Sequence, residues 1–266
     1  MPRPSPRAYL LITLFALAMV LLPFLFWYST WFGRHLSDTQ LDEYFADAEH
    51  PRHIQQALVQ VGERISHVQS AARWYPRVLA QAAHANLEIR QTAAWVLGQD
   101  HSYAPFHDAL LHLLSDPEPM VRRNAALSLA AFGDGAGRPE LRAMLRPFTL
   151  SVRVAGAVHW RVTGSEVVTA GTILGSVGRA EIRAPVPGAI SRLYLGEGMA
   201  AGQGTALAEL SPDPDHVWES LRALYLVGRS ADLEDVMRFT RPVPGMPDRV
   251  RKQAELTVPA IRARAD

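Results

Sequence analysis

Histidine and carboxylate side chains are the groups in this sequence that could ligate a metal ion or transfer a proton. His50 and His53 stand three positions apart across a proline, and His107 and His112 stand five positions apart in a helical pattern. Neither spacing matches a zinc-binding motif such as His-Glu-x-x-His. The sequence therefore predicts no metal ligand at either pair, and no catalytic or cofactor-binding residue elsewhere.

Acidic residues gather over a short stretch near the start of the chain. They are Asp38, Asp42, Glu43, Asp47 and Glu49. A charge run of this kind is more typical of a solvated helix face than of a catalytic carboxylate pair. The chain also lacks cysteine, phosphate-loop motifs and Gly-x-Ser-x-Gly. We therefore predict that the protein is not an enzyme and needs no cofactor.

Composition narrows the class of partner. The 27 basic and 26 acidic residues leave a net charge of +1, which is far from the strongly basic balance of nucleic-acid-binding proteins. We predict no nucleic-acid partner. Tryptophan and tyrosine residues include candidates for protein contacts, because these side chains anchor many interfaces. The candidates are Trp74, Tyr75, Trp95, Tyr103, Trp160, Tyr194, Trp218 and Tyr225.

The first element along the chain is an apolar segment over residues 8–33, which has no charged side chain. About 20 apolar residues suffice for a helix to cross a bilayer, and Tyr9, Trp27 and Trp31 match the aromatic belts of the two interfaces. We predict a transmembrane helix here. A cleaved signal peptide is the alternative, but the apolar run is longer than a signal core and ends in bulky aromatic residues.

Basic residues flank this segment unevenly, with Arg3 and Arg7 in the residues before it. Basic flanks favour the cytoplasmic side of a membrane, so residues 1–7 are predicted to form a short cytoplasmic tail. This orientation predicts a single-pass protein of the bacterial inner membrane, with its C-terminal body in the periplasm.

Residues 37–148 have helical periodicity and contain a self-similar unit. The stretch 87–97 aligns with 119–129, which lies 32 positions later, and each copy is followed by a second amphipathic stretch. The units have paired alanines, which allow two helices to approach closely. This pattern resembles HEAT repeats of the short bacterial kind, so the resemblance implies a stack of helical pairs.

Arginine recurs at the same place in both copies, as Arg90 and Arg122. We interpret each as an intramolecular ion pair or as a cap on loop carbonyls that braces adjacent loops. Binding of a ligand by these arginines is the less favoured alternative.

Residues 151–212 differ from their surroundings because they form short β-rich segments separated by glycine. The stretch 168–174 aligns with 201–207 at an offset of 33, and Gly156-Ala-Val aligns with Gly188-Ala-Ile one residue out of step. Two similar β units can cover each other's apolar faces. The repeat therefore predicts a small barrel or sandwich.

The stretch 181–188, Glu-Ile-Arg-Ala-Pro-Val-Pro-Gly, resembles a biotinyl/lipoyl-like domain (a barrel-sandwich hybrid), a fold that also forms part of periplasmic adaptor (membrane fusion) proteins. In carrier proteins of this family the modified lysine lies on the hairpin between the halves, which here places Val177 at that point. The chain's single lysine is Lys252, outside the domain. The resemblance therefore implies a module without covalent biotin or lipoate, and the long helical hairpin of adaptor proteins is also missing.

Residues 213–266 return to helical periodicity after Asp213-Pro214 and are predicted to form C-terminal HEAT-like helices. The predicted fold class is thus α+β multidomain. It comprises an N-terminal transmembrane helix, α-helical HEAT-like repeats, an inserted small β barrel-sandwich domain and C-terminal helices.

These elements favour a non-enzymatic, membrane-anchored scaffold. We expect an accessory or assembly subunit of a larger respiratory or transport complex, whose integral membrane subunits bind the repeats and the β module. A divergent periplasmic adaptor subunit of an export pump is the alternative, which the missing hairpin disfavours. The link between short HEAT repeats and phycobilin lyases suggests an enzymatic possibility, but no residue requires it.

Overall fold

The structure is a computed structural model that describes residues 12, 15–24, 35–68 and 70–264. It contains helices and two antiparallel sheets. The predicted cytoplasmic tail, residues 1–7, lies outside the described residues.

The predicted transmembrane helix over residues 8–33 is contradicted. Within that span the described helical residues are 12 and 15–24. No helix in the described part of the chain combines the length and apolar character needed to cross a membrane. The rest of the predicted span lies outside the described residues. The predicted location, a single pass of the bacterial inner membrane with a periplasmic body, is contradicted with it.

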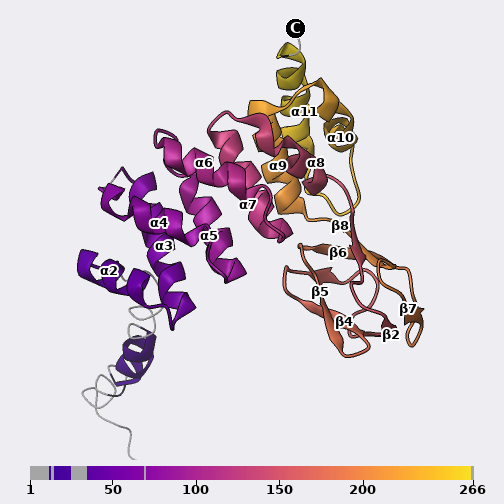
Figure 1. Ribbon diagram of the computed structural model, residues 1–266, viewed down its shortest axis with the longest axis horizontal. Helices are drawn as coiled ribbons and strands as arrows, with labels where there is room; N and C mark the ends of the chain where they lie inside the picture. Colours follow the sequence, from indigo (N-terminus) through magenta and orange to yellow (C-terminus); the bar gives the residue numbers. More distant parts are fainter. Residues whose placement is uncertain (1–11, 13–14, 25–34, 69, 265–266) are drawn as a thin grey trace, which may run out of the picture.

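Helices follow one another from residue 38 to residue 144. They are α2 (Asp38–Ala46), α3 (Pro51–Ser66), the 3-10 helix η1 (Ala72–Trp74), α4 (Tyr75–Gln81), α5 (Leu87–Leu97), α6 (Ala104–Leu113), α7 (Pro119–Ala131), the 3-10 helix η2 (Gly135–Gly137) and α8 (Arg138–Met144). Side-chain caps fix several starts: Ser37 forms a capping box with Gln40, and Asn86 accepts hydrogen bonds from the first turn of α5. The row of helices runs from α2 to α8 and beyond in Figure 1.

The helices form two layers, as stacked helical pairs should. In one layer α3, α5 and α7 lie side by side, and α4 and α6 pack against α5 and α7 from the other layer. Ala93, Ala94, Ala125 and Ala126 are fully buried at these contacts. The paired alanines therefore serve the close helix approach that the sequence indicates.

The chain then enters a β module made of short strands. They are β1 (Phe148–Ser151), β2 (Gly156–Trp160), β3 (Val167–Val168), β4 (Ile173–Val177), β5 (Ala180–Arg183), β6 (Gly188–Leu193), β7 (Ala200–Ala201) and β8 (Ala206–Pro212). One sheet has the order β1-β8-β6-β3 and the other has the order β5-β4-β2-β7. All pairs are antiparallel. The buried residues between the sheets form a core of their own.

The two halves of the module repeat each other strand by strand. β3 and β4 correspond to β7 and β8, which begin 33 positions later. At equivalent positions the corresponding strands have the same pattern of exposed and buried residues. Leu174 and Leu207 are both fully buried. Gly171 and Gly204 turn the chain with φ of +85° and +82°, a backbone conformation that favours glycine. Each sheet takes its short edge strand from the opposite half, so the halves interlock.

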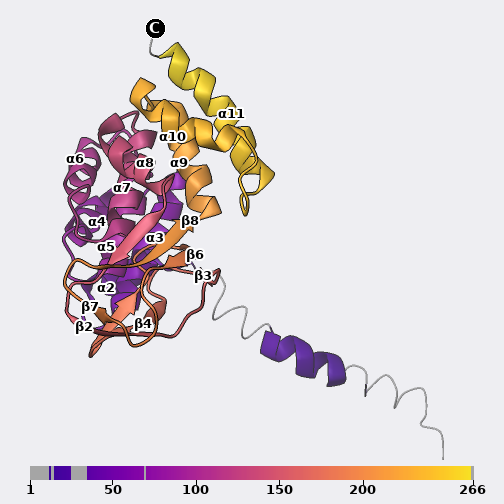
Figure 2. The same cartoon turned by 90° about the vertical axis from the view of Figure 1, so that its right-hand side faces the viewer.

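After the module the chain returns to the row of helices. It forms α9 (Pro214–Val227), the 3-10 helix η3 (Ser230–Asp232), α10 (Leu233–Met237), the 3-10 helix η4 (Arg238–Thr240) and α11 (Asp248–Ala263). α9 packs on α7 and α8, and α11 packs on α9. The β module is therefore an insertion between α8 and α9, and Figures 1 and 2 both place it away from α11.

Candidate protein-binding surfaces

Arg90 connects consecutive helical pairs. Its Nε and Nη2 donate to the two carboxylate oxygens of Asp116 at 2.7 and 3.1 Å, while Nη1 donates to the carbonyls of His84 and Ala85 at 2.9 and 3.0 Å. Burial opposes ionisation of Asp116, but the hydrogen bonds from Arg90 and from the Glu118 backbone outweigh it and lower the pKa of Asp116. The hydrogen bonds of Arg90 thus join two loops of the fold.

Arg122 repeats this arrangement one unit later. Its Nε donates to Glu140 at 3.0 Å, and its Nη1 donates to the carbonyls of Asp116 and Pro117 at 2.8 and 3.1 Å. The interpretation of both arginines as braces between loops is confirmed by these contacts.

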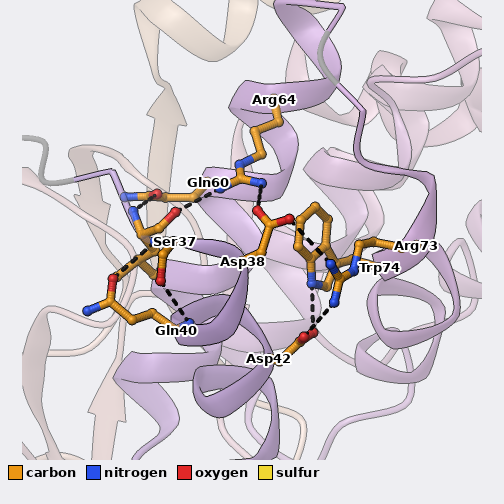
Figure 3. A network of polar contacts seen from close by, with 9 residues as sticks. Ser37, Asp38, Gln40, Asp42, Gln60, Arg64, Arg73 and Trp74 are labelled. Carbon is orange, nitrogen blue, oxygen red and sulfur yellow. Dashed lines mark hydrogen bonds and ion pairs between the residues drawn. The ribbon is translucent and has the colours of Figure 1, made fainter.

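Arginines bind two acids of the stretch at the start of the helical row, Asp38 and Asp42 (Figure 3). Asp38 accepts hydrogen bonds from Arg64 at 2.7 Å and Arg73 at 3.3 Å. Asp42 accepts from Arg73 at 2.6 Å and from the indole of Trp74 at 3.0 Å. The Trp74 ring is buried, with the guanidinium groups of Arg64 and Arg73 each 4.8 Å from its centroid. These hydrogen bonds hold α2 against α3 and η1.

The structure separates one histidine pair and brings the other together. His107 lies 2.8 Å from Asp134 through its Nε2, while His112 is exposed on the next turn of α6. His50 and His53 instead share one carboxylate, that of Asp47, at distances of 2.7 to 2.9 Å. The sequence spacing did not reveal that Asp47 contacts these two histidines, because Asp47 is one of several acids in the same stretch.

An apolar patch crosses four helices, α5, α7, α9 and α11. It comprises Trp95 on α5, Tyr225 and Leu226 on α9, and Leu256 on α11, whose exposed fractions are 39, 44, 53 and 60%. These side chains line a depression of about 640 Å³ together with Leu127 of α7. We call these five residues the apolar patch. Large apolar side chains gathered in one exposed depression are typical of an interaction site.

Charged residues border the apolar patch. Glu219 and Arg222 of α9 line the same depression. Burial raises the pKa of Glu219, and the Arg222 guanidinium lies 4.7 Å from the ring of Trp218. An apolar centre with a polar border is the usual anatomy of a protein interface.

A second depression, of about 750 Å³, lies between the helical row and the β module. Its walls include Leu87, Pro119 and Met120 from the starts of α5 and α7, and the strands β1 and β5. Both strands are edges of their sheets, so this depression presents open backbone edges as well as apolar side chains. Met120 also packs into the β core, which joins the module to the row.

Of the aromatic residues that the sequence offers as contact candidates, Trp95 and Tyr225 belong to the apolar patch, whereas Trp74 and Tyr75 are buried. Leu226 and Leu256 escaped notice in the sequence, although each lies on the outer side of an amphipathic helix. In the β module Val177 is 1% exposed, so its side chain belongs to the core. The turn that follows it, Gly178-Arg179, joins β4 directly to β5.

Comparison with known families gives a match to some of the helices. A family model described as HEAT repeats matches residues 75–157, from the start of α4 to the beginning of β2. Comparison with curated proteins gave no match. The match does not extend over residues 158–212, so the resemblance of the β module to biotinyl/lipoyl-like domains and adaptor proteins stays a prediction. The predicted HEAT repeats are confirmed over the matched residues.

Proposed function

We propose that this protein is a non-enzymatic scaffold, an accessory or assembly subunit that binds other proteins of a larger complex through its helical repeats. HEAT repeats support this proposal because stacked helical pairs create an extended surface for partners. Ion pairs such as that of Arg90 with Asp116 hold neighbouring repeats together.

The apolar patch is the observation that carries the proposal. Leu226 and Leu256 expose more than half of their surface, and Trp95 and Tyr225 lie in the same depression. Because α5, α9 and α11 are far apart in sequence, the patch is produced by stacking of the repeats and cannot be the leftover face of one helix. We infer that apolar side chains of a partner protein fill the depression, with Trp95 as the aromatic anchor.

The proposal also covers the β module. We propose that it is a biotinyl/lipoyl-like domain used for docking without a covalent cofactor. Its interlocked halves and their 33-residue repeat support this assignment. The two-residue connection from β4 to β5 offers no room for the long hairpin of an adaptor protein, so no specific observation favours the adaptor alternative.

Affinity purification under native conditions tests the scaffold. The tagged full chain is produced at its normal level in its own cells, and proteins recovered in fixed ratio are quantified by mass spectrometry. The test variant is Leu226→Asp combined with Leu256→Asp. The matched control is Met237→Asp, which changes a similarly exposed apolar residue of α10 outside the apolar patch.

We expect the wild type and the control to recover the same partner, and the double variant to lose it while keeping the circular dichroism of a folded chain. Undiminished recovery by the double variant would contradict the role of the apolar patch. Failure of the wild type to recover any protein in fixed ratio would contradict the scaffold itself.

A further inference from the structure

The corner between α2 and α3 gathers two imidazoles around one carboxylate. Nδ1 of His50 lies 2.9 Å from each carboxylate oxygen of Asp47, and Nδ1 of His53 lies 2.7 Å from Oδ2. One nitrogen or oxygen atom from each of the three residues lies within 4.8 Å of the others. These three residues, here called the corner triad, are close enough to contact a single ion.

The backbone fixes the positions of the corner triad. Asp47 is the C-cap of α2, His50 is the N-cap of α3, and His53 lies in the first turn of α3. The backbone N–H of His50 donates to Asp47 at 3.3 Å. The ring of Tyr44 stacks on the ring of His53 at 4.3 Å between centroids. The carboxylate and one imidazole are thus held in place before any ion arrives.

Asp47 also differs from the other acids of α2 in its partners. Asp38 pairs with Arg64 and Arg73, and Asp42 pairs with Arg73 and a further arginine. The ion-pair partners of Asp47 among the described residues are the two histidines. A metal ion would therefore replace the direct contacts between these histidines and Asp47, and no arginine would have to leave.

We propose that the corner triad binds one divalent transition-metal ion of the zinc class. Two imidazoles and a carboxylate are ligands that suit Zn²⁺, whereas Mg²⁺ and Ca²⁺ prefer oxygen ligands. In the neutral rings the tautomer with its proton on Nε2 presents the Nδ1 lone pair to the ion. Zinc bonds of about 2.0 to 2.2 Å in tetrahedral geometry require each imidazole nitrogen to move about half an ångström away from the carboxylate oxygen.

The exposure of the corner triad permits that adjustment and leaves room for water. The side chains of His50, His53 and Asp47 are 63, 38 and 25% exposed. Three protein ligands with open remaining positions are typical of a solvent-accessible zinc site. The ion would join α2 to α3, the outermost described pair of the helical row, where one side lacks a neighbouring repeat. Bound metal should therefore stabilise this end of the row.

Isothermal titration of the tag-free full chain with ZnCl₂, after removal of metals by EDTA and dialysis, tests the proposal. The variants are His50→Ala, which removes an exposed ligand, and Asp47→Asn, which keeps an acceptor for the His50 backbone. The control is His67→Ala at the other end of α3, where Nδ1 lies 2.8 Å from the carbonyl of Glu63. Circular dichroism and thermal unfolding with and without zinc accompany each titration.

We expect one zinc ion per chain in the wild type and in His67→Ala, with a higher Tm in the presence of zinc. Both triad variants should keep their circular dichroism, bind zinc at least tenfold more weakly and lose the zinc-dependent rise in Tm. The proposal is overturned if the wild type binds no zinc, or if His50→Ala and Asp47→Asn bind it as tightly as His67→Ala does. Equal binding of Mg²⁺ would also contradict it.

Discussion

The helical row and the β module are both built from repeats of nearly equal length, yet they close in different ways. Helical units recur after 32 residues and β units after 33. Each helical pair packs only on its neighbours, so the row could be extended at either end. The two β halves exchange their short strands, β3 and β7, between the sheets. The module is therefore complete with two units.

This difference decides where the stabilising contacts lie. In the row, polar braces such as Arg90 cross from one unit to the loop of the next. In the module, backbones approach so closely that glycine is needed at strand crossings: a Cβ on Gly188 would overlap the carbonyl oxygen of Ser211. A substitution in the row should therefore destabilise mainly the neighbouring repeats, whereas a substitution at a strand crossing should destabilise the whole module.

The largest effect is expected from Gly188→Val in β6. A valine side chain there would overlap the β8 backbone and push apart two central strands, which should lower the free energy of unfolding by about 3 kcal/mol. The reason is close approach, since Gly188 has no positive φ. Chemical denaturation followed by circular dichroism measures the change. Gly164→Val is the control, because a Cβ at Gly164 meets no atom within 4 Å. Equal unfolding curves for the two variants would disprove the crowding argument.

Arg90→Ala should give the second-largest effect and should act on the helical row. The side chains of Arg90 and Asp116 are 13 and 6% exposed, so the substitution leaves a buried carboxylate without its cation. We expect the free energy of unfolding to fall by about 2 to 3 kcal/mol. Hydrogen exchange should show the loss in α5 to α7 and leave the β strands protected. A uniform loss over both regions would show that row and module unfold as one unit.

Arg122→Ala tests whether the braces differ in strength. Arg122 and Glu140 are 27 and 16% exposed, so solvent screens this pair more than the pair of Arg90 and Asp116. We expect a loss of about 1 kcal/mol. The same denaturation measurement applies, with Arg90→Ala as the reference. A loss as large as that of Arg90→Ala would mean that the carbonyl contacts, which both arginines share, outweigh the ion pairs.

The smallest expected effect is a pH dependence of the row that comes from Asp116. Its pKa is lower in the folded chain than the ordinary value of about 3.9. A lowered pKa means that the unfolded chain binds the proton more readily, so the contribution to stability is present above about pH 4 and is lost as the pH falls through the folded value. The difference in stability between wild type and Asp116→Asn should shrink below pH 4. A difference that stays constant from pH 6 to pH 3 would contradict it.

Periodicity and local spacing predicted much of the fold. Paired alanines and the recurring arginines predicted the helical repeats, and glycine spacing predicted the paired β units. The transmembrane helix was predicted from an uncharged apolar run, and it is wrong because no described helix has the length and apolar character that crossing a membrane requires.

The sequence by itself determined the units of this protein: their lengths, their buried alanines and the glycines that allow close strands. These features depend on neighbours within one helix or hairpin. The tertiary structure decided which distant side chains meet, including Trp95 with Leu226 and Leu256 in the apolar patch. It also placed Asp47 between two histidines across a helix corner. Such contacts depend on how helices stack and where the chain turns, and spacing along the chain does not specify either.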